Sequence, residues 1–157
     1  HPEDATAWLG AARVAAARAD FATARSSIDR ALGVRPDDPM LWYERGGLAL
    51  TRNEPEAAAA DLARAITLDP FDPEFRQRQA LALALLGRVA EARAEADAAE
   101  RLRVERAEIE AIRDGLVTAP DDPALQLRAA RWLLDHGRDE EGLRWTRKIL
   151  SARPSHA

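Results

Sequence analysis

Hydrophobic and small residues recur along the chain in blocks of helical length, separated by short polar or proline-containing stretches. Within a block the apolar positions fall three or four residues apart, which is typical of an amphipathic helix that buries one face. No stretch indicates a strand. The pattern therefore predicts an all-α fold built from helices of about 13 residues, with one longer helix.

Three related stretches, VRPDDP, LDPFDP and TAPDDP, divide the chain. In each, an Asp precedes the second Pro; Asp is a good N-cap, and Pro is favoured at the first helical position. The Pro three residues earlier stops the preceding helix. Each stretch is predicted to end one helix and begin the next. The residues are Asp38, Asp72 and Asp122 (caps), Pro39, Pro73 and Pro123 (starts), and Pro36, Pro70 and Pro120 (stops).

A second break falls inside each unit, which predicts an αα-hairpin of two helices joined by a short turn. The breaks lie at Ala19-Asp20, Asn53-Glu54-Pro55, Gly87 and His136-Gly137. Two offsets within the units carry only small residues, as close packing of the paired helices requires. These residues are Ala12, Gly46, Ala80 and Ala130, and Ala24, Ala58, Ala92 and Gly142.

The first two units start 34 residues apart, and this period with two helices per unit resembles the tetratricopeptide repeat. Matching positions are Trp8/Trp42, Ala12/Gly46, Phe21/Pro55, Ala24/Ala58, Ala31/Ala65 and Pro36/Pro70. The third and fourth units depart from it, since Arg76 and Gln126 stand at the Trp position. The resemblance implies one right-handed solenoid domain over 1–157, with repeats at about 5–38, 39–72, 73–122 and 123–156; the last closes at Pro154.

The third unit is longer than the others. Its residues 88–115 contain no Gly or Pro before Gly115, which predicts one continuous helix. Leu102, Ile109, Ile112 and Leu116 form an apolar stripe on its second half. Two interpretations stay open. The fourth unit folds back and covers the stripe in a small three-helix cluster, or the stripe pairs two copies of the chain as a short coiled coil.

Composition excludes several classes of protein. The net charge of −4 provides no general field for nucleic acid, and without Cys there is neither a disulfide framework nor a thiolate metal site. No apolar run is long enough to enter and cross a membrane. Because the chain starts with His1, we expect a piece of a longer protein. Its expected compartment is the cytoplasm or the periplasm, with the cytoplasm preferred.

No catalytic, cofactor or metal site is predicted. His1, His136 and His156 lack the spacing of metal ligands. The stretch DHGRDEE at 135–141 offers a His and four carboxylates, but Gly137 suits a helix stop and the acids suit the next helix N-terminus. We therefore expect a protein without enzymatic activity.

The family resemblance implies that the first helices of the units line a concave groove, which in relatives holds a peptide or a partner helix. The residues expected to form the groove are Leu9, Arg13, Tyr43, Gly47, Leu50, Gln77, Leu81, Leu85, Leu127 and Arg131. Some relatives clamp a chaperone C-terminus with Lys and Asn where this chain has Leu9 and Arg13, so that ligand is excluded. An apolar groove of this kind binds a partner or is covered by segments of the same protein that lie outside this chain.

The expected function is a protein–protein interaction scaffold. Two alternatives remain, a regulatory arm of a larger bacterial enzyme such as a kinase, and self-assembly through the long helix. RNA binding would require a basic stripe, and the groove offers only Arg13 and Arg131. Trp145 on the last helix either packs within the fourth unit or a following repeat, or anchors a partner.

Overall fold

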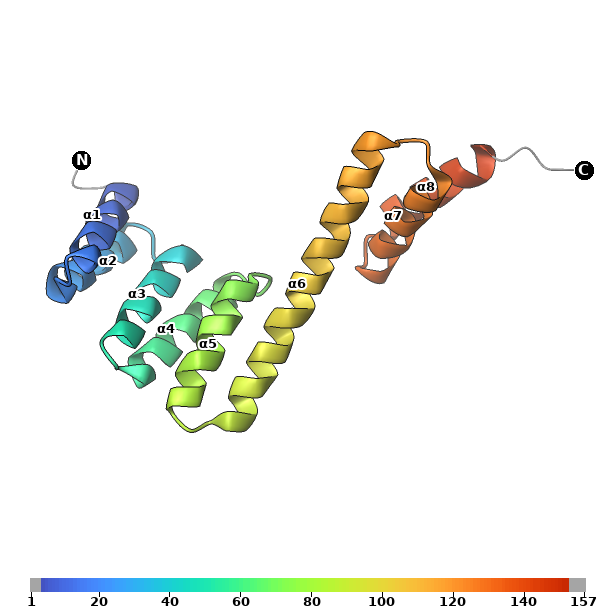
Figure 1. The fold of residues 1–157 in the computed structure, drawn as a ribbon. Helices are drawn as coiled ribbons and strands as arrows, with labels where there is room; N and C mark the ends of the chain where they lie inside the picture. Colours follow the sequence, from blue (N-terminus) through green and yellow to red (C-terminus); the bar gives the residue numbers. More distant parts are fainter. Residues whose placement is uncertain (1–3, 153–157) are drawn as a thin grey trace, which may run out of the picture. The chain divides into compact units, whose positions relative to one another are not determined.

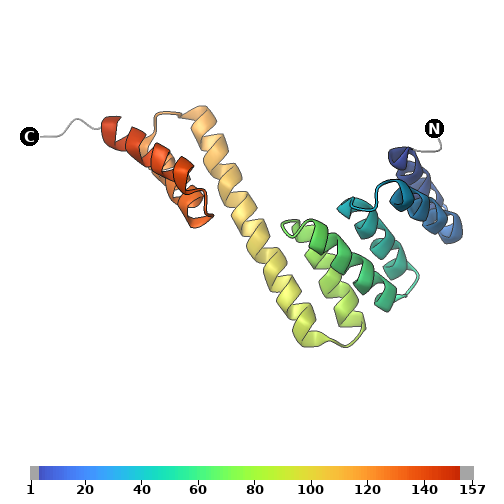
Figure 2. The same ribbon diagram turned by 180° about the vertical axis from the view of Figure 1, so that it is seen from behind.

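A computed structural model of the chain describes residues 4–152. Eight helices and no strand make up this described part, and the helices follow one another as hairpins (Figures 1 and 2). They are α1 (Ala5–Ala17), α2 (Phe21–Val34), α3 (Pro39–Thr51), α4 (Pro55–Leu68), α5 (Pro73–Leu85), α6 (Val89–Thr118), α7 (Pro123–Asp135) and α8 (Asp139–Ala152). The predicted all-α hairpin fold is confirmed. The expectations for His1, Pro154 and His156 lie outside the described residues.

The chain divides into two compact units, His1–Leu102 and Arg103–Ala157. The first contains α1 to α5 and the beginning of α6, and the second contains the rest of α6 with α7 and α8. The division falls inside the long helix, at the point where an ordinary second helix of a repeat is expected to end. No helix of the described part has the length and hydropathy required to cross a bilayer.

The Asp-Pro pairs begin helices as predicted. The carboxylate of Asp38 accepts a hydrogen bond from the amide of Met40 at 3.0 Å, and Asp72 and Asp122 each accept one of 2.8 Å from the amide two residues ahead. These bonds satisfy amides of the first turn that have no partner within the helix. The preceding helices α2, α4 and α6 all end two residues before the stopping Pro.

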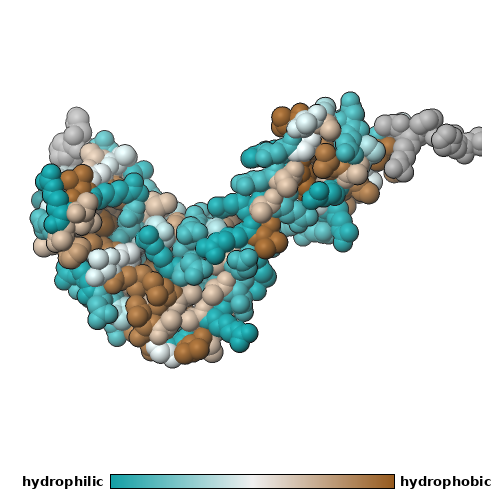
Figure 3. Space-filling view, in the orientation of Figure 1, coloured by the Kyte–Doolittle hydropathy of each residue, from teal (hydrophilic) through white to brown (hydrophobic). Residues whose placement is uncertain are grey.

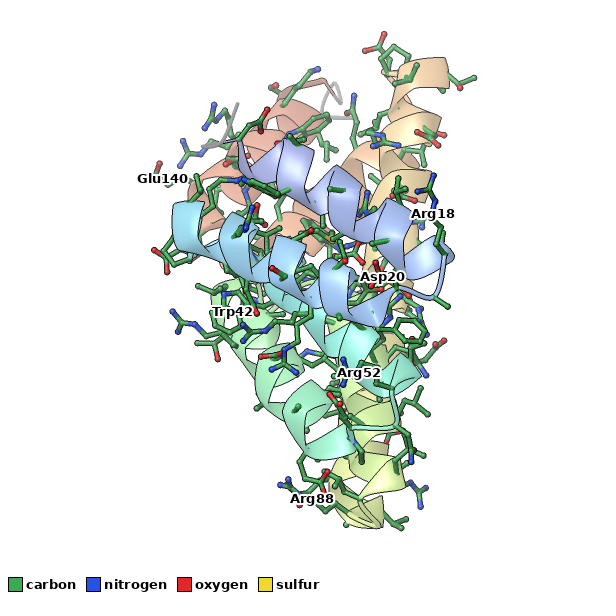
Figure 4. The ribbon with its side chains drawn as sticks, turned by 90° about the vertical axis from the view of Figure 1, so that its left-hand side faces the viewer. Arg18, Asp20, Trp42, Arg52, Arg88 and Glu140 are labelled. Carbon is green, nitrogen blue, oxygen red and sulfur yellow. The ribbon has the colours of Figure 1, made fainter. Side chains whose placement is uncertain are left out.

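Each hairpin turn contains one residue with a left-handed backbone. These residues are Ala19, Asn53, Gly87 and Gly137, with φ between 59° and 73°. In the first turn the amide of Asp20 donates to Ala15 O and that of Ala19 donates to Ala16 O, both at 2.9 Å, which closes a Schellman motif. Figure 4 labels residues beside three of the turns: Arg18 and Asp20, Arg52, and Arg88. Four turns of one geometry make each helix pair antiparallel.

Small residues bring the paired helices into close contact. A Cβ added to Gly46 would lie 2.7 Å from Cγ of Leu62, and one added to Gly142 would lie 2.6 Å from Cγ of Leu134. Since a real Cβ does not approach so closely, α3 packs on α4, and α7 on α8, at a distance that only glycine allows at these positions. The buried residues around the first of these contacts are Ala49, Ala58, Ala59, Leu62 and Ala82.

The long helix continues past Gly115 to Thr118, three residues beyond the predicted end. The side chain of Leu125 occupies the space that a side chain at position 115 would need, since a Cβ there would lie 2.9 Å from its Cδ1. Gly115 therefore acts as a packing residue and not as a stop; Pro120 ends the helix. Ile112 is only 1% exposed in the single chain, so the center of the apolar stripe is buried without a second copy.

Candidate functional site

A hollow of about 410 Å³ opens on the first unit, between side chains of α1, α3 and α5. Its floor is apolar and comes partly from α2. The lining residues are Leu9, Ala12, Arg13, Ala16, Phe21, Ala24, Ile28, Glu44, Gly47, Leu48, Leu50, Thr51, Arg78 and Leu81. The space-filling view shows apolar side chains gathered over α3 and α5 on one face of this unit (Figure 3). The hollow has the size of an ordinary ligand pocket.

Half of the residues predicted for the groove line this hollow. They are Leu9, Arg13, Gly47, Leu50 and Leu81. Tyr43 lies beside it, with its ring centroid 4.9 Å from that of the buried Phe75 and the two rings tilted by 37°. Gln77 and Leu85 are exposed on α5 and do not line the hollow. The structure thus brings together predicted residues from the first three repeats.

The remaining predicted residues, Leu127 and Arg131, belong to the second unit. Leu127 is exposed on α7, and Arg131 forms an exposed ion pair of 3.6 Å with Asp135 one turn ahead. Leu127 and Arg131 both lie on α7, and neither lines the hollow of the first unit.

An ion pair crosses the hollow from the first repeat to the second. The guanidinium of Arg13 donates to Oε1 of Glu44 through Nε, at 2.9 Å, and through Nη2. The charge of Arg13 is therefore balanced by a carboxylate of this chain. The pair places a polar group of zero net charge beside the apolar floor of the hollow.

A second guanidinium, that of Arg78 on α5, also lines the hollow. Its Cζ is 4.0 Å from the centroid of the Tyr43 ring, a cation–π geometry. Gly47 makes this position possible, because a Cβ there would collide with Nη1 of Arg78. Burial raises the pKa of the Tyr43 hydroxyl, and the positive charge of Arg78 opposes that rise.

Sequence reasoning missed Glu44 and Arg78, which occupy the same place in successive repeats, five residues after Pro39 and Pro73. The groove was instead predicted to contain the residues directly before them, Tyr43 and Gln77. The opposite charges of Arg13 and Glu44 at facing positions were the available signal, because oppositely charged side chains on adjacent inner helices favour contact.

The stretch DHGRDEE has the structural role expected from its sequence. Gly137 adopts φ of 71°, and Asp139, Glu140 and Glu141 lie in the first turn of α8. The His136 ring stacks on Trp132 at 4.0 Å, and its Nδ1 lies 2.7 Å from the carbonyl oxygen of Trp132. Among residues 4–152, no three His, Asp or Glu side chains are grouped closely enough to hold a metal ion.

The tetratricopeptide repeat family matches two overlapping segments of the sequence, residues 9–73 and 48–105. Together these segments cover more than half of the chain. The chain belongs to the tetratricopeptide repeat family. No curated protein matches it in sequence. As a tetratricopeptide repeat protein, it has the helical-repeat architecture of modules that generally bind other proteins.

Solved structures of tetratricopeptide proteins share this fold. A MamA protein is 16% identical with a TM-score of 0.61, and the alignment covers 94% of this chain and 90% of that one. YrrB, titled a TPR protein with an unusual peptide-binding site, is 22% identical with a TM-score of 0.56 and coverages of 98% and 71%. The O-GlcNAc transferase of Thermobaculum terrenum is 25% identical over 83% of this chain, with a TM-score of 0.60; that region is 26% of the transferase chain.

Proposed function

We propose that this chain is a non-catalytic binding module that holds a short segment of a partner protein in the hollow of the first unit. The observation that carries the proposal is the hollow itself, a cavity of about 410 Å³ with an apolar floor, lined from three consecutive repeats. A cavity of this size accommodates one or two large side chains of a bound peptide. The peptide-binding site named for YrrB, which has the same fold, supports this assignment.

The surface next to the hollow also favours a polypeptide ligand. Leu81 is 51% exposed and Leu85 is 52% exposed, one turn apart on α5. Apolar side chains grouped at a concave site mark surfaces that bind a partner. An extended segment can place one side chain in the hollow and cover these leucines with the next.

A second role follows from the transferase match, in which a region with this fold forms part of an enzyme chain. In that role the module is a regulatory arm, and the catalytic activity lies outside residues 1–157. The hollow serves the same purpose in both cases, because an arm directs its enzyme by binding a protein segment.

The experiment is a selection of random 12-residue peptides displayed on phage against the purified chain, followed by affinity measurements by fluorescence polarisation. Ala16 lines the hollow, so Ala16→Phe fills it, whereas Ala11 is exposed on the same helix outside the lining. We expect Ala16→Phe to lower the affinity of selected peptides about tenfold or more and Ala11→Phe to leave it unchanged.

Leu81→Ser is the second variant, since an exposed residue can be changed without loss of the fold, and it should also weaken binding. Circular dichroism verifies that each variant is folded. If the selected peptides bind Ala16→Phe and Leu81→Ser as tightly as the wild type, the hollow is not the binding site and the proposal fails.

A further inference from the structure

We propose that the segment bound in the hollow carries an apolar side chain followed closely by an Asp or Glu, and that Arg78 binds this carboxylate. The inference rests on the proposed function and names the class of ligand.

Two arginines line the hollow, and only one of them is paired with a carboxylate. Arg13 is neutralised by Glu44 through two hydrogen bonds to one carboxylate oxygen. Arg78 forms no ion pair with any residue in the described range 4–152, and its guanidinium lies on the face of the Tyr43 ring. A cation held on an aromatic face keeps its N–H donors for another group.

The position of Arg78 is defined by its surroundings. Tyr43 supports the guanidinium from one side, and Tyr43 is itself held by Phe75. Nη1 occupies the space that a side chain at position 47 would need, and Gly47 leaves that space to it. Because the guanidinium lies between the Tyr43 ring and Gly47, less side-chain freedom is lost when a carboxylate binds than for a fully mobile arginine.

The charged groups of the hollow complement a ligand with one negative charge. Arg13, Glu44 and Arg78 are the charged residues of the lining, and together they carry a net charge of +1. Since Glu44 forms an ion pair with Arg13, the unbalanced positive charge is at Arg78. A carboxylate beside Arg78 makes the complex neutral, and a charge-assisted hydrogen bond is stronger than one between neutral groups.

The carboxylate belongs to a side chain within the segment and not to a chain terminus. Arg78, Leu81 and Leu85 are spaced i, i+3, i+7 on α5, so they share one face of the helix. The apolar surface therefore continues beyond Arg78, through side chains that are half exposed. A peptide that ended at Arg78 would leave this surface uncovered, whereas an internal Asp or Glu allows the chain to continue over it.

The test uses the peptides obtained by phage selection, resynthesised with an amidated C-terminus to exclude a terminal carboxylate. We expect Asp or Glu to be enriched next to an apolar residue, and Arg78→Gln to weaken binding of these peptides about tenfold. Arg93→Gln is the matched control, because Arg93 is exposed on α6 outside the hollow.

A gain-of-affinity variant provides an independent arm. Glu44→Gln leaves Arg13 without its carboxylate and gives the hollow a second unbalanced cation. Binding of peptides with two acidic residues should strengthen several-fold, and the gain should disappear at high salt and in the double variant Arg13→Gln/Glu44→Gln.

The outcomes separate this inference from the proposed function. Peptides that bind the hollow, are lost in Ala16→Phe and show no acidic preference or dependence on Arg78 would overturn the inference and leave the proposed function intact. Acidic peptides that bind only with a free C-terminus would also overturn it. Peptides insensitive to Ala16→Phe would overturn the proposed function itself.

Discussion

The side-chain amide of Gln126 donates a hydrogen bond of 2.7 Å to the carbonyl oxygen of Pro120, six residues earlier. Two other repeats contain the same relationship: Trp42 Nε1 donates to Pro36 O at 2.7 Å, and Arg76 donates to Pro70 O through Nε at 3.3 Å. The accepting Pro stops one helix and the donor lies in the first turn of the next. Three chemically different side chains therefore perform one task, because each has an N–H on a long planar group.

Loss of this hydrogen bond should destabilise the chain. Gln126 is 5% exposed, so Gln126→Leu keeps the side chain buried but removes the donor to Pro120. We expect the free energy of unfolding to fall by about 1 kcal/mol, the net contribution of one hydrogen bond. Urea denaturation followed by circular dichroism measures it. An unchanged unfolding midpoint would show that Pro120 O does not depend on this donor.

Glycine-to-alanine substitutions should have opposite effects at two helical positions. At Gly46 the new Cβ collides with the buried Leu62, and we expect a loss of about 1–3 kcal/mol from overpacking. At Gly10, in the middle of α1, a Cβ meets nothing within 4 Å. Gly10→Ala should therefore stabilise the chain by up to about 1 kcal/mol through helix propensity. Thermal unfolding of the two variants, compared with the wild type, distinguishes them by sign.

Ala19 has φ of 59°, a backbone conformation that is unfavourable for any residue with a Cβ. Ala19→Gly should raise the free energy of unfolding by about 0.5–1 kcal/mol, because glycine relieves this strain at some cost in unfolded-state entropy. The control is Ala11→Gly within α1, where the same substitution should lower stability by about 1 kcal/mol. Similar losses at both positions would be inconsistent with a left-handed residue in the turn.

Arg45 connects three helices of the first unit. It donates to both carboxylate oxygens of Asp61, at 2.8 and 2.7 Å, and to Asp29 at 2.9 Å. The hydrogen bonds to Asp61 raise the pKa of the Arg45 guanidinium, so it stays charged at every pH of interest. Asp61 is buried, and Arg45 is its ion-pair partner, at 2.7 Å.

Arg45→Met keeps the apolar stem but leaves the Asp61 carboxylate without its partner. We expect the free energy of unfolding to fall by about 2 kcal/mol, less than for a fully buried pair because the pair retains some exposure. The double variant Arg45→Met/Asp61→Leu should be more stable than Arg45→Met alone, since it removes the unpaired charge. Urea unfolding of the three proteins checks the order, and equal stabilities of the single and double variants would contradict it.

Much of this fold follows from local features of the sequence. The Asp-Pro pairs, the stopping prolines, the turn residues and the small residues at matched offsets place the helices and pair them, because each acts within a few residues or across one hairpin. Arg76 and Gln126 were interpreted as departures from the repeat, yet the structure gives them the hydrogen bond made by Trp42. The three residue types differ in sequence, but each donates a hydrogen bond to the carbonyl oxygen of the Pro six residues earlier.

The features that depend on the tertiary structure are those formed between repeats. The contact of Arg13 with Glu44 and the position of Arg78 over Tyr43 and Gly47 join residues about 30 positions apart, through long side chains with many rotamers. The course of α6 past Gly115 likewise depends on Leu125 filling the space beside it. Short-range rules place helices along a chain, but the side chains that meet between neighbouring repeats are selected by packing and charge in three dimensions.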